Sequence, residues 1–425
     1  MNNGRYEDSM KVCVVGLGYI GLPTAVILAS HGCEVIGVDI SYFVVDNLKQ
    51  GKVVIEEPNL EFITKECVMK GMLRPKLEPE IADAFIIAVP TLFQGEDKSC
   101  DLTYVLNALE SILPYLRKGN TVIIESTIAP LSTEESILPI LEKQGFKIGI
   151  NLYLAHCPER VLPGRILYEL ENNDRIIGGI TRECAEHAAK VYRTFVRGKL
   201  ILTNARTAEL SKCMENTFRD VNIALSNELA KICNELHIDC MQVIRMVNRH
   251  PRVQMLTPGP GVGGHCLAID PYFICSKAKD TSRLISLARE INTSMPEYVE
   301  TQVRALLPVA SKIAVFGLSY KGNIDDTRES PALEVVNRLR EGYELMIYDP
   351  HVHGYKTTSM EEAVRGADMI LVLSDHKEFA TLDHKQLVEW MNHPVLFDTR
   401  NFIQPQLGSG LTVINFGNVF QYVKK

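Results

Sequence analysis

The sequence predicts an α/β protein with two doubly wound parallel sheets joined by a long central helix. Apolar strand runs alternate with helical stretches in the first half of the chain, which is typical of parallel sheets flanked by helices. About forty residues then lack Gly and Pro and carry apolar positions at helical spacing. After them the first pattern partly returns. A chain of 425 residues is also long for one hydrophobic core.

The first domain opens with a strand, a glycine turn, a helix and a second strand. These are predicted at residues 11–15, 16–21, 22–31 and 34–39, and further strands at 84–90, 121–126 and 152–155. In the turn, Gly16 permits the sharp bend, Gly18 lets the backbone approach a pyrophosphate and Gly21 allows close helix packing. We expect a Rossmann-like domain.

Asp39 at the end of the second strand identifies the cofactor. It follows Gly16 by 23 residues, where a carboxylate binds ribose hydroxyls and favours NAD over NADP. A purely structural glycine turn leaves Asp39 unexplained. The predicted NAD contacts of this motif are Gly16, Gly18, Tyr19, Ile20, Gly21 and Asp39. Thr91 and Thr127 end later strands on the ligand-binding edge, and each is either a ligand contact or a helix cap.

The second half of the chain predicts a linking helix and a second sheet. The helix spans about 206–247, a helical stretch follows at 283–292, and strands are expected at 312–316, 344–349, 369–373 and 395–398. Gly317-Leu-Ser-Tyr320-Lys321-Gly322 replaces the full glycine motif, so a nucleotide would bind through side chains such as Lys321. We expect an NAD-binding Rossmann domain at 1–205, a central helical region at 206–300, and a second Rossmann-like domain at 301–425.

Cys266 lies in the segment GVGGHCLAIDPY, behind a glycine-rich turn. An enzyme that carries an alcohol to an acid with a nicotinamide cofactor traps the aldehyde on a thiol. The glycines at 261, 263 and 264 remove side chains and leave room for a ligand beside the backbone. The alternative is a small buried cysteine, which suits the other ten.

Polar residues elsewhere supply candidate partners for this thiol. Lys212, Asn216 and Arg219 share one helix face, where Lys212 and Asn216 are suited to stabilise an oxyanion; the alternative is a solvated face. Glu159 follows a strand and is either an acid/base or part of an ordinary turn. Asp270 either activates water or caps the next element.

Basic and histidine residues suggest an anion site but no metal. Arg249, His250 and Arg252 precede the glycine loop and are suited to pair with phosphates. His351 and His353 have no third ligand nearby in the sequence, so we interpret them as surface residues and predict no metal.

Composition excludes several classes of protein. A net charge of −7 with scattered Lys and Arg argues against nucleic-acid binding. Eleven cysteines without a Cys-x-x-Cys fit a reducing cytoplasm better than a disulfide framework or a zinc site. The nearly uncharged stretch 12–30 contains glycines and a proline and predicts a strand and helix rather than a signal peptide or membrane span. The first strand begins at Lys11, so a start at Met1 or Met10 preserves the fold.

Long strings in this chain resemble the UDP-glucose and GDP-mannose dehydrogenases. They are CPERVLPGR, TAELSKCMENTFRDVNIALSNELA, NRHPRVQMLTPGPGVGGHC and IDDTRESPALE. The resemblance spans nearly the whole chain and is strongest to the branch acting on UDP-N-acetylhexosamines. It implies two Rossmann-like domains, a long helix that forms a dimer interface, and a homodimer or homotetramer in which His250 or Arg252 reaches the partner subunit.

The resemblance also implies roles for individual residues. The catalytic set it implies is Cys266, Lys212, Asn216, Asp270, Glu159 and Thr127. Arg328 would contact NAD together with the glycine motif, Thr91 and Thr127. The UDP-sugar would be held by Arg160, Val161, Lys212, Asn216, Arg219, His250, Arg252, Gly263, Tyr320, Lys321 and Arg400.

Two departures from the family pattern concern the sugar. Pro163 replaces a glutamate, and Ile269 replaces a lysine, of the enzymes that act on UDP-glucose. We therefore do not expect UDP-glucose as the substrate. The resemblance implies four-electron oxidation of UDP-N-acetyl-D-mannosamine by two NAD⁺, with UDP-N-acetylglucosamine as the alternative sugar. A simple two-electron dehydrogenase and a sensor that binds without turnover are the other hypotheses, although a sensor has no use for the catalytic set.

Overall fold

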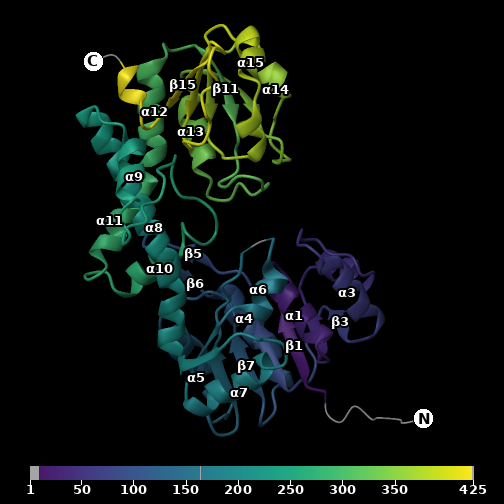
Figure 1. Cartoon of the computed structure of the whole chain (residues 1–425). Coiled ribbons are helices and arrows are strands. Elements are labelled where there is room, and N and C mark those ends of the chain that lie inside the picture. Colours follow the sequence, from purple (N-terminus) through teal and green to yellow (C-terminus); the bar gives the residue numbers. More distant parts are fainter. Residues whose placement is uncertain (1–8, 163, 424–425) are drawn as a thin grey trace. The chain divides into compact units, whose positions relative to one another are not determined.

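The computed structural model describes residues 9–162 and 164–423, so Met1 and Pro163 lie outside the described residues. The chain forms two compact units (Figure 1). The first contains residues 1–215 and 272–278, and the second contains residues 216–271 and 279–425. Each unit has its own central sheet. In the described part of the chain, none of the helices combines the length and apolar character that crossing a membrane requires.

The sheet of the first unit has eight strands in the order β10-β9-β8-β7-β4-β1-β2-β3. The strands are β1 (Lys11–Val15), β2 (Glu34–Val38), β3 (Leu73–Lys76), β4 (Ala84–Ile87), β7 (Thr121–Ile124), β8 (Tyr153–His156), β9 (Arg175–Gly179) and β10 (Leu200–Asn204). From β3 to β8 all neighbours are parallel, in the strand order of a dinucleotide-binding fold. The predicted doubly wound fold is confirmed.

The outer edge of this sheet differs from the expected parallel arrangement. Strand β9 runs antiparallel to β8, and β10 then pairs parallel with β9. Neither strand was predicted. In β9, Gly178 and Gly179 interrupt the apolar run because the backbone is crowded there, and a Cβ on Gly178 would lie 2.5 Å from the Ala208 side chain.

Helices cover both faces of the first sheet. They are α1 (Gly21–Ser30), α2 (Tyr42–Lys49), α3 (Leu60–Met69), α4 (Thr103–Ile112), α5 (Leu138–Lys143), α6 (Ile166–Asn172) and α7 (Arg182–Tyr192), with a hairpin of β5 (Leu92–Gln94) and β6 (Ser99–Asp101). Alternate side chains of β1 enter opposite cores, Val12 and Val14 one, and Cys13 and Val15 the other. Burial on both faces explains the continuous apolar strand run.

The long helical stretch contains a break that we did not predict. Helix α8 (Ala205–Leu236) ends where His237 takes a left-handed φ of 56°. Helix α9 (Cys240–Val247) then begins behind Asp239, whose carboxylate accepts hydrogen bonds from the N–H groups of Met241 and Gln242. A lone aspartate before an apolar run was the available signal for this second start.

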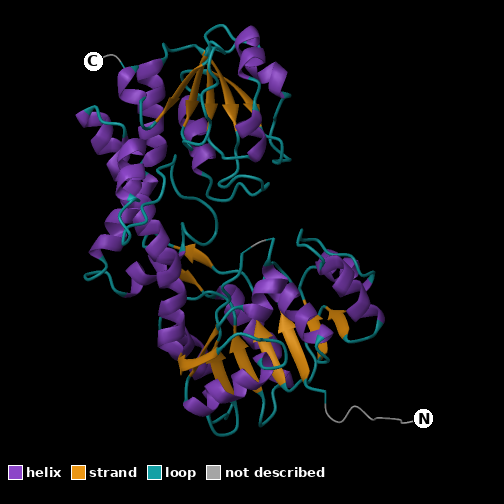
Figure 2. Cartoon of the chain, in the orientation of Figure 1, coloured by secondary structure: helices purple, strands orange, loops and turns teal. Residues whose placement is uncertain are grey.

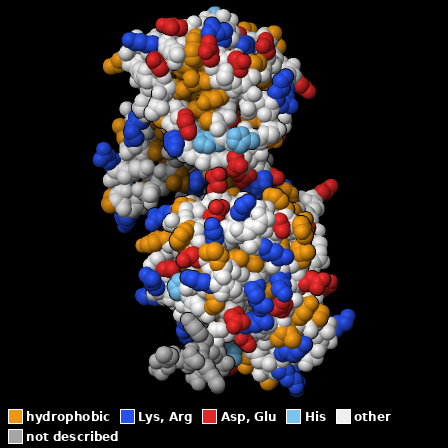
Figure 3. Space-filling view, turned by 90° about the vertical axis from the view of Figure 1, so that its right-hand side faces the viewer, with side chains coloured by type: hydrophobic (Ala, Val, Ile, Leu, Met, Phe, Trp, Pro, Cys, Tyr) orange, Lys and Arg blue, Asp and Glu red, His pale blue; other side chains and the backbone are white. Residues whose placement is uncertain are grey.

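The second unit has a five-stranded parallel sheet in the order β12-β11-β13-β14-β15. Its strands are β11 (Lys312–Phe316), β12 (Glu344–Tyr348), β13 (Met369–Val372), β14 (Val395–Asp398) and β15 (Thr412–Asn415). Figure 2 shows helices on both faces. The remaining helices of the unit are α11 (Arg283–Thr293), α12 (Met295–Leu306), α13 (Pro331–Leu339), α14 (Met360–Val364) and α15 (His384–Trp390), and α10 (Asp270–Lys277) begins in this unit. Charged side chains of both signs are mixed over the faces seen in Figure 3.

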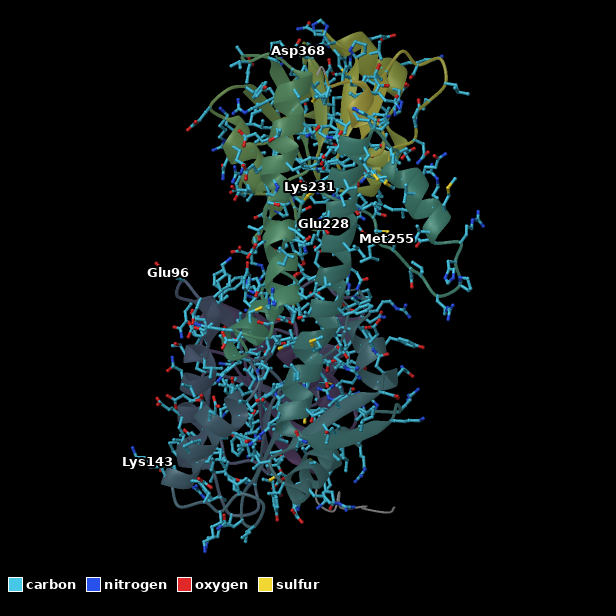
Figure 4. The ribbon with its side chains drawn as sticks, turned by 90° about the vertical axis from the view of Figure 1, so that its left-hand side faces the viewer. Glu96, Lys143, Glu228, Lys231, Met255 and Asp368 are labelled. Carbon is cyan, nitrogen blue, oxygen red and sulfur yellow. The ribbon has the colours of Figure 1, made fainter. Side chains whose placement is uncertain are left out.

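Hydrogen bonds between buried polar side chains connect α8 to α11 in the second unit. The carboxylate of Asp220 accepts hydrogen bonds from Arg289 (2.6 Å) and Asn292 (2.8 Å). Asn227 donates to Asn292 (2.8 Å) and accepts from the Gly259 N–H (2.9 Å), at the start of the glycine loop. Further along α8, Lys231, labelled in Figure 4, donates to Ser294 just before α12. The glycine loop is thus fixed to α8 through side-chain amides.

Replacing Arg289 with methionine tests this network. The change leaves the fully buried Asp220 carboxylate without its guanidinium partner, so we expect the second unit to lose about 3–5 kcal/mol of stability. Urea unfolding followed by circular dichroism measures the loss. Arg304→Met removes an exposed pair with Glu300 and should cost less than about 1 kcal/mol. Equal losses of unfolding free energy in the two variants would show that the buried pair stabilises the unit no more than the pair with Glu300 does.

Candidate active site

The glycine turn of the first unit forms a cradle for a dinucleotide. Gly16 has a left-handed φ of +94°, and a Cβ there would lie 2.7 Å from the Ala88 carbonyl oxygen. A Cβ on Gly21, the first residue of α1, would lie 1.8 Å from the Gly16 carbonyl oxygen. A Cβ on Gly18 would meet nothing within 4 Å. Gly16 and Gly21 are therefore required by packing, whereas Gly18 faces open space before the helix N-terminus, where a pyrophosphate fits.

Asp39 follows β2 and is aimed at the same turn. Its two oxygens accept hydrogen bonds from the N–H groups of Leu17 (3.0 Å) and Ser41 (2.8 Å), and the residue is only partly buried. Each carboxylate oxygen keeps further acceptor capacity for a ribose hydroxyl. The residues present therefore fit NAD. Beside the turn, Tyr19 is exposed and Ile20 is partly buried.

The strand ends bring Thr91 and Thr127 together. The Thr91 hydroxyl donates to the Thr127 carbonyl oxygen at 2.6 Å, and both residues are partly buried. Neither residue precedes a helix of the structure, since β5 follows Thr91 and Thr127 leads into a turn. The helix-cap alternative is therefore wrong for both.

Glu159 belongs to a buried ion-pair cluster that the sequence did not reveal. The Arg175 guanidinium on β9 pairs with Glu159 and with Glu125, which directly follows β7. Burial raises the pKa of the Glu125 carboxyl, and the Arg175 charge opposes that effect. The other oxygen of Glu159 accepts from the Arg160 N–H at 2.6 Å. Glu159 is thereby held at the end of β8 in a fixed orientation.

Lys212 on α8 lies near a buried histidine. His156, the last residue of β8, is completely buried, and burial together with the Lys212 charge lowers its pKa to about 3. His156 is thus neutral beneath the ammonium group. In the same unit the Arg160 guanidinium pairs with Glu215, also on α8, at 2.7 Å. Val161 follows it in the chain and is partly buried.

In the second unit, Asn216 and Asp270 meet as their predicted roles require. The Asn216 amide donates to the Asp270 carboxylate at 2.6 Å. Cys266 is exposed on the turn that enters α10, and its carbonyl oxygen accepts from the Asp270 N–H at 2.9 Å. The cysteine and the aspartate therefore lie one helical turn apart on the same face. Arg219, on the neighbouring turn of α8, is exposed.

The glycine loop packs differently from our expectation. We predicted that its glycines leave room for a ligand, but side chains and backbone of the second sheet's loops fill that space. A Cβ on Gly263 would lie 2.4 Å from the Glu329 carbonyl oxygen, and one on Gly264 would lie 2.6 Å from the Tyr320 ring. A Cβ on Gly261 would lie 3.0 Å from the Pro331 side chain. The glycines therefore serve close packing of the cysteine loop.

The candidate substrate residues of the second sheet surround the same loop. The Arg400 guanidinium donates to Asp375 at 3.0 Å and lies beside Gly259, where a Cβ would be 3.2 Å away. Tyr320 is partly buried against the glycine loop, whereas Lys321 is exposed. The carbonyl oxygen of Arg328 accepts from the Gly264 N–H at 3.1 Å, and its side chain pairs with Asp326.

The second unit also contains a basic segment before the glycine loop and a cluster of two histidines and a glutamate. Arg249, His250 and Arg252 are all exposed, as an anion-binding segment requires. His351, for which the sequence offered no third ligand, lies beside His376 and Glu378, with ligand atoms of all three within 4.8 Å of one another. Proximity in sequence could not reveal this cluster, because its members follow different strands.

A dinucleotide cradle, a second Rossmann-like sheet and a cysteine turn supported by an amide–carboxylate pair define an NAD-dependent dehydrogenase. The chain belongs to the UDP-glucose/GDP-mannose dehydrogenase family. Residues 10–196 match the family's NAD binding domain, residues 206–294 its central domain, and residues 314–405 its UDP binding domain.

Individual relatives match along almost the whole chain. The UDP-N-acetyl-D-mannosamine dehydrogenase of Methanococcus vannielii is 48% identical over 420 residues, covering 96% of each chain. The NDP-N-acetyl-D-galactosaminuronic acid dehydrogenase of Ralstonia solanacearum is 46% identical over 415 residues, covering 92% of this chain and 96% of its own. The solved structure of the UDP-N-acetyl-mannosamine dehydrogenase from Staphylococcus aureus has a TM-score of 0.89 at 50% identity, covering 97% of this chain and 99% of its own.

Asp39→Ala tests the cofactor cradle. Loss of hydrogen bonds from a carboxylate to the ribose should raise the KM for NAD⁺ about 10- to 100-fold, with a smaller effect on the KM for NADP⁺. Steady-state kinetics at saturating sugar measures both constants. Asp46→Ala on α2 is the control and should leave them unchanged. An unaltered KM for NAD⁺ in Asp39→Ala would contradict the assigned contact.

Proposed function

We propose that this chain oxidises the C6 hydroxyl of UDP-N-acetyl-D-mannosamine to the carboxylate with two NAD⁺, through a thiohemiacetal and a thioester on Cys266. The observation that carries the proposal is the exposed Cys266 on a turn shared with Asp270, whose carboxylate Asn216 holds at 2.6 Å. The names and high identity of the relatives from Methanococcus and Staphylococcus support the choice of sugar.

The chemistry requires two oxidations and one hydrolysis. NAD⁺, when bound, accepts the hydride released in each oxidation. The alcohol first loses a hydride and a proton and becomes an aldehyde. The Cys266 sulfur adds to the aldehyde carbon, and loss of a second hydride and proton from that carbon gives the thioester. Water then breaks the carbon–sulfur bond, releasing the uronate and restoring the thiol.

The side chains on α8 and α10 suit these steps. Lys212 and Asn216 are four residues apart on α8, so their ammonium and amide groups share a face and stabilise an oxyanion on the reacting carbon. Asp270, oriented by Asn216, accepts a proton from the hydrolytic water. Glu159, oriented by Arg175, assists proton transfer, and Thr127 positions water.

The remaining assignments follow the three family domains. Residues 1–205 bind NAD, 206–300 form the catalytic and dimerisation region, and 301–425 bind the UDP-sugar; the matched domain ranges support this division. Arg328 reaches the cofactor together with Gly16, Gly18, Tyr19, Ile20, Gly21, Asp39, Thr91 and Thr127. The sugar nucleotide contacts Arg160, Val161, Lys212, Asn216, Arg219, His250, Arg252, Gly263, Tyr320, Lys321 and Arg400. With eleven cysteines and NAD as oxidant, the chain suits the cytoplasm.

A second copy of the chain is the proposed partner. Apolar side chains on α8 are exposed at spacings of four and seven residues, which places them in one stripe; they are Leu210, Met214, Phe218, Leu225, Ile232 and Leu236. The most exposed of these, Phe218, leaves 67% of its surface in water. A dimer would bury this stripe, and we propose that His250 or Arg252 on the exposed segment completes the partner's sugar site.

A galactose-configured sugar is the second candidate substrate. The relative from Ralstonia is nearly as similar as the relative from Methanococcus, and its name specifies an N-acetyl-D-galactosaminuronic acid product. The two sugars differ only in ring stereochemistry, so the same chemistry at C6 would apply.

The stoichiometry of NADH formation is the direct test of the proposed function. We expect two NADH per UDP-N-acetyl-D-mannosamine consumed, measured at 340 nm, and no activity on the glucosamine or galactosamine stereoisomers. A ratio of one with aldehyde release would indicate a two-electron dehydrogenase. Activity on another epimer alone would keep the chemistry and change the substrate, and binding of the sugar nucleotides without NADH would indicate a sensor.

Cys266→Ser separates the covalent route from the binding function. Because the serine hydroxyl is a far weaker nucleophile than a thiolate, acid formation should fall at least about a thousandfold while sugar binding persists. Cys275→Ser on α10 is the matched control and should retain activity. Acid production at the native rate by Cys266→Ser would rule out the thioester.

Phe218→Asp tests the interface and the shared basic segment together. A charge in the centre of the stripe should convert the assembly to monomers in sedimentation velocity. Monomers should also bind the UDP-sugar at least about tenfold more weakly, because the partner's basic residue is lost. A monomer with native sugar affinity would contradict the shared residue, and an unchanged oligomer would contradict the stripe.

A further inference from the structure

The second sheet repeats the nucleotide-binding design of the first. Gly317-Leu318-Ser319 follows β11 as Gly16-Leu17-Gly18 follows β1. The Gly317 N–H donates to the Tyr348 carbonyl oxygen at 2.9 Å, and the Leu318 N–H donates to Asp349 at 2.7 Å. In the first unit, Leu17 makes the equivalent bond to Asp39. Asp349 therefore occupies the position that binds ribose in the first unit.

A histidine closes this position in the second unit. Asp39 is partly exposed, but the Asp349 side chain is 0% exposed and so is that of His376, whose Nε2 lies 3.2 Å from Asp349 Oδ2. Burial raises the pKa of the Asp349 carboxyl, but hydrogen bonds from His376 and from the N–H groups of Leu318, His351 and Val352 outweigh it and lower the pKa to about 2. With its side chain completely buried, this carboxylate has no access to a ligand.

The other ring nitrogen of His376 holds the loop that follows β11. The Asn323 N–H donates to Nδ1 at 2.8 Å. Because a backbone N–H can only donate, Nδ1 is an acceptor and the ring proton lies on Nε2, facing Asp349. His376 thus connects the end of β12 to residues 319–323. Both of its nitrogens are committed to these contacts, and the ring is completely buried.

Neighbours of His376 hold the same loop at further points. Asp375 accepts from the Gly322 N–H and from Arg400, each at 3.0 Å. The Lys377 N–H donates to the Asn323 side chain at 3.0 Å. Residues 374–377, which follow β13, therefore clamp the loop that carries Tyr320 and Lys321. The loop lies between β11 and β13, at the point where the strand order reverses and ligands of such sheets bind.

The geometry of the cluster formed by His351, His376 and Glu378 argues against metal binding. A metal ion binds an imidazole nitrogen in the plane of the ring. Neither ring nitrogen of His376 is open to an ion, because Nδ1 accepts from the Asn323 N–H and Nε2 lies 3.2 Å from Asp349. The ring of His351 is stacked beside it, with centroids 4.7 Å apart. His351 instead pairs with Glu378 at 3.2 Å.

We propose that His376 is a positioning residue for the nucleotide site of the second unit. Its ring lies against Asp349, where a ribose would lie in a dinucleotide-binding fold, and it fixes loop 319–323. UDP is then held by Tyr320 and Lys321 instead of by Asp349. The inference rests on the proposed binding of a UDP-sugar to this unit. It explains why two sheets of the same design take different nucleotides: the ribose carboxylate is open in one and sealed in the other.

Three variants of His376 test the proposal. His376→Asn keeps an acceptor for the Asn323 N–H, His376→Gln keeps a donor for Asp349, and His376→Leu keeps neither. We expect the Kd for UDP, measured by calorimetry on the full chain, and the KM for the UDP-sugar to rise about tenfold or more in the Leu and Gln variants. In the Asn variant both should stay within about threefold of the native values. The KM for NAD⁺ should not change in any of them.

Controls separate loop positioning from general destabilisation. His384→Leu replaces another buried histidine of the same unit, on α15, and should lower the melting temperature without raising the Kd for UDP. An unchanged Kd in His376→Leu would overturn the proposal, as would a Gln variant that binds better than the Asn variant. A rise in the Kd for UDP after treatment of the native chain with EDTA would assign the cluster to a metal and also overturn it.

The outcome is independent of catalytic turnover. If the native chain binds UDP but oxidises none of the UDP-sugars, the proposed reaction fails while the UDP affinities of the variants still decide the role of His376. If the native chain oxidises the sugar and the variants keep the native KM, the positioning role alone fails. Absence of UDP binding by the native chain would overturn both.

Discussion

The buried contacts of Asp220 and Asn227 on α8 determine where the chemistry of the second unit takes place. A buried carboxylate and two buried side-chain amides need protein partners in place of water, and here they find them in Arg289 and in one another. This demand fixes α11 against α8 and sets the start of the glycine loop through Gly259. Four residues before Asp220, the Asn216 amide donates a hydrogen bond to the Asp270 carboxylate. One helix thus positions both the cysteine loop and the residue expected to activate water.

Local sequence signals predicted most strands and the cofactor cradle because those features depend on short-range physics. Buried parallel strands need continuous apolar runs, and the cradle at Gly16 needs glycine for backbone reasons. Strand β9 was not predicted because Gly178, crowded by α8, and Gly179, crowded by α7, dilute its apolar run. The break at His237 escaped because a left-handed histidine carries no periodic signal.

Within the candidate site, the sequence predicted which residue types take part but not the contacts that hold them in place. Asn216 and Asp270 were candidates by residue type, but their pairing was not predicted, and Arg175, His156 and His376 carry no motif that links them to their contacts. Their partners lie on strands that are neighbours only in the folded sheet. Buried charge clusters of this kind depend on tertiary packing, so the sequence alone could not reveal them.

The packing of the glycine loop against Tyr320 couples recognition to reactivity. Glycines form the part of the Cys266 segment that packs against the Tyr320 loop. The Gly264 N–H also donates a hydrogen bond to the Arg328 carbonyl oxygen. Any ligand that orders the Tyr320 loop therefore also orders the nucleophile. Under the proposed binding of the UDP-sugar, contacts at the uridine end would act on the segment that carries Cys266, because that segment packs against the same loop.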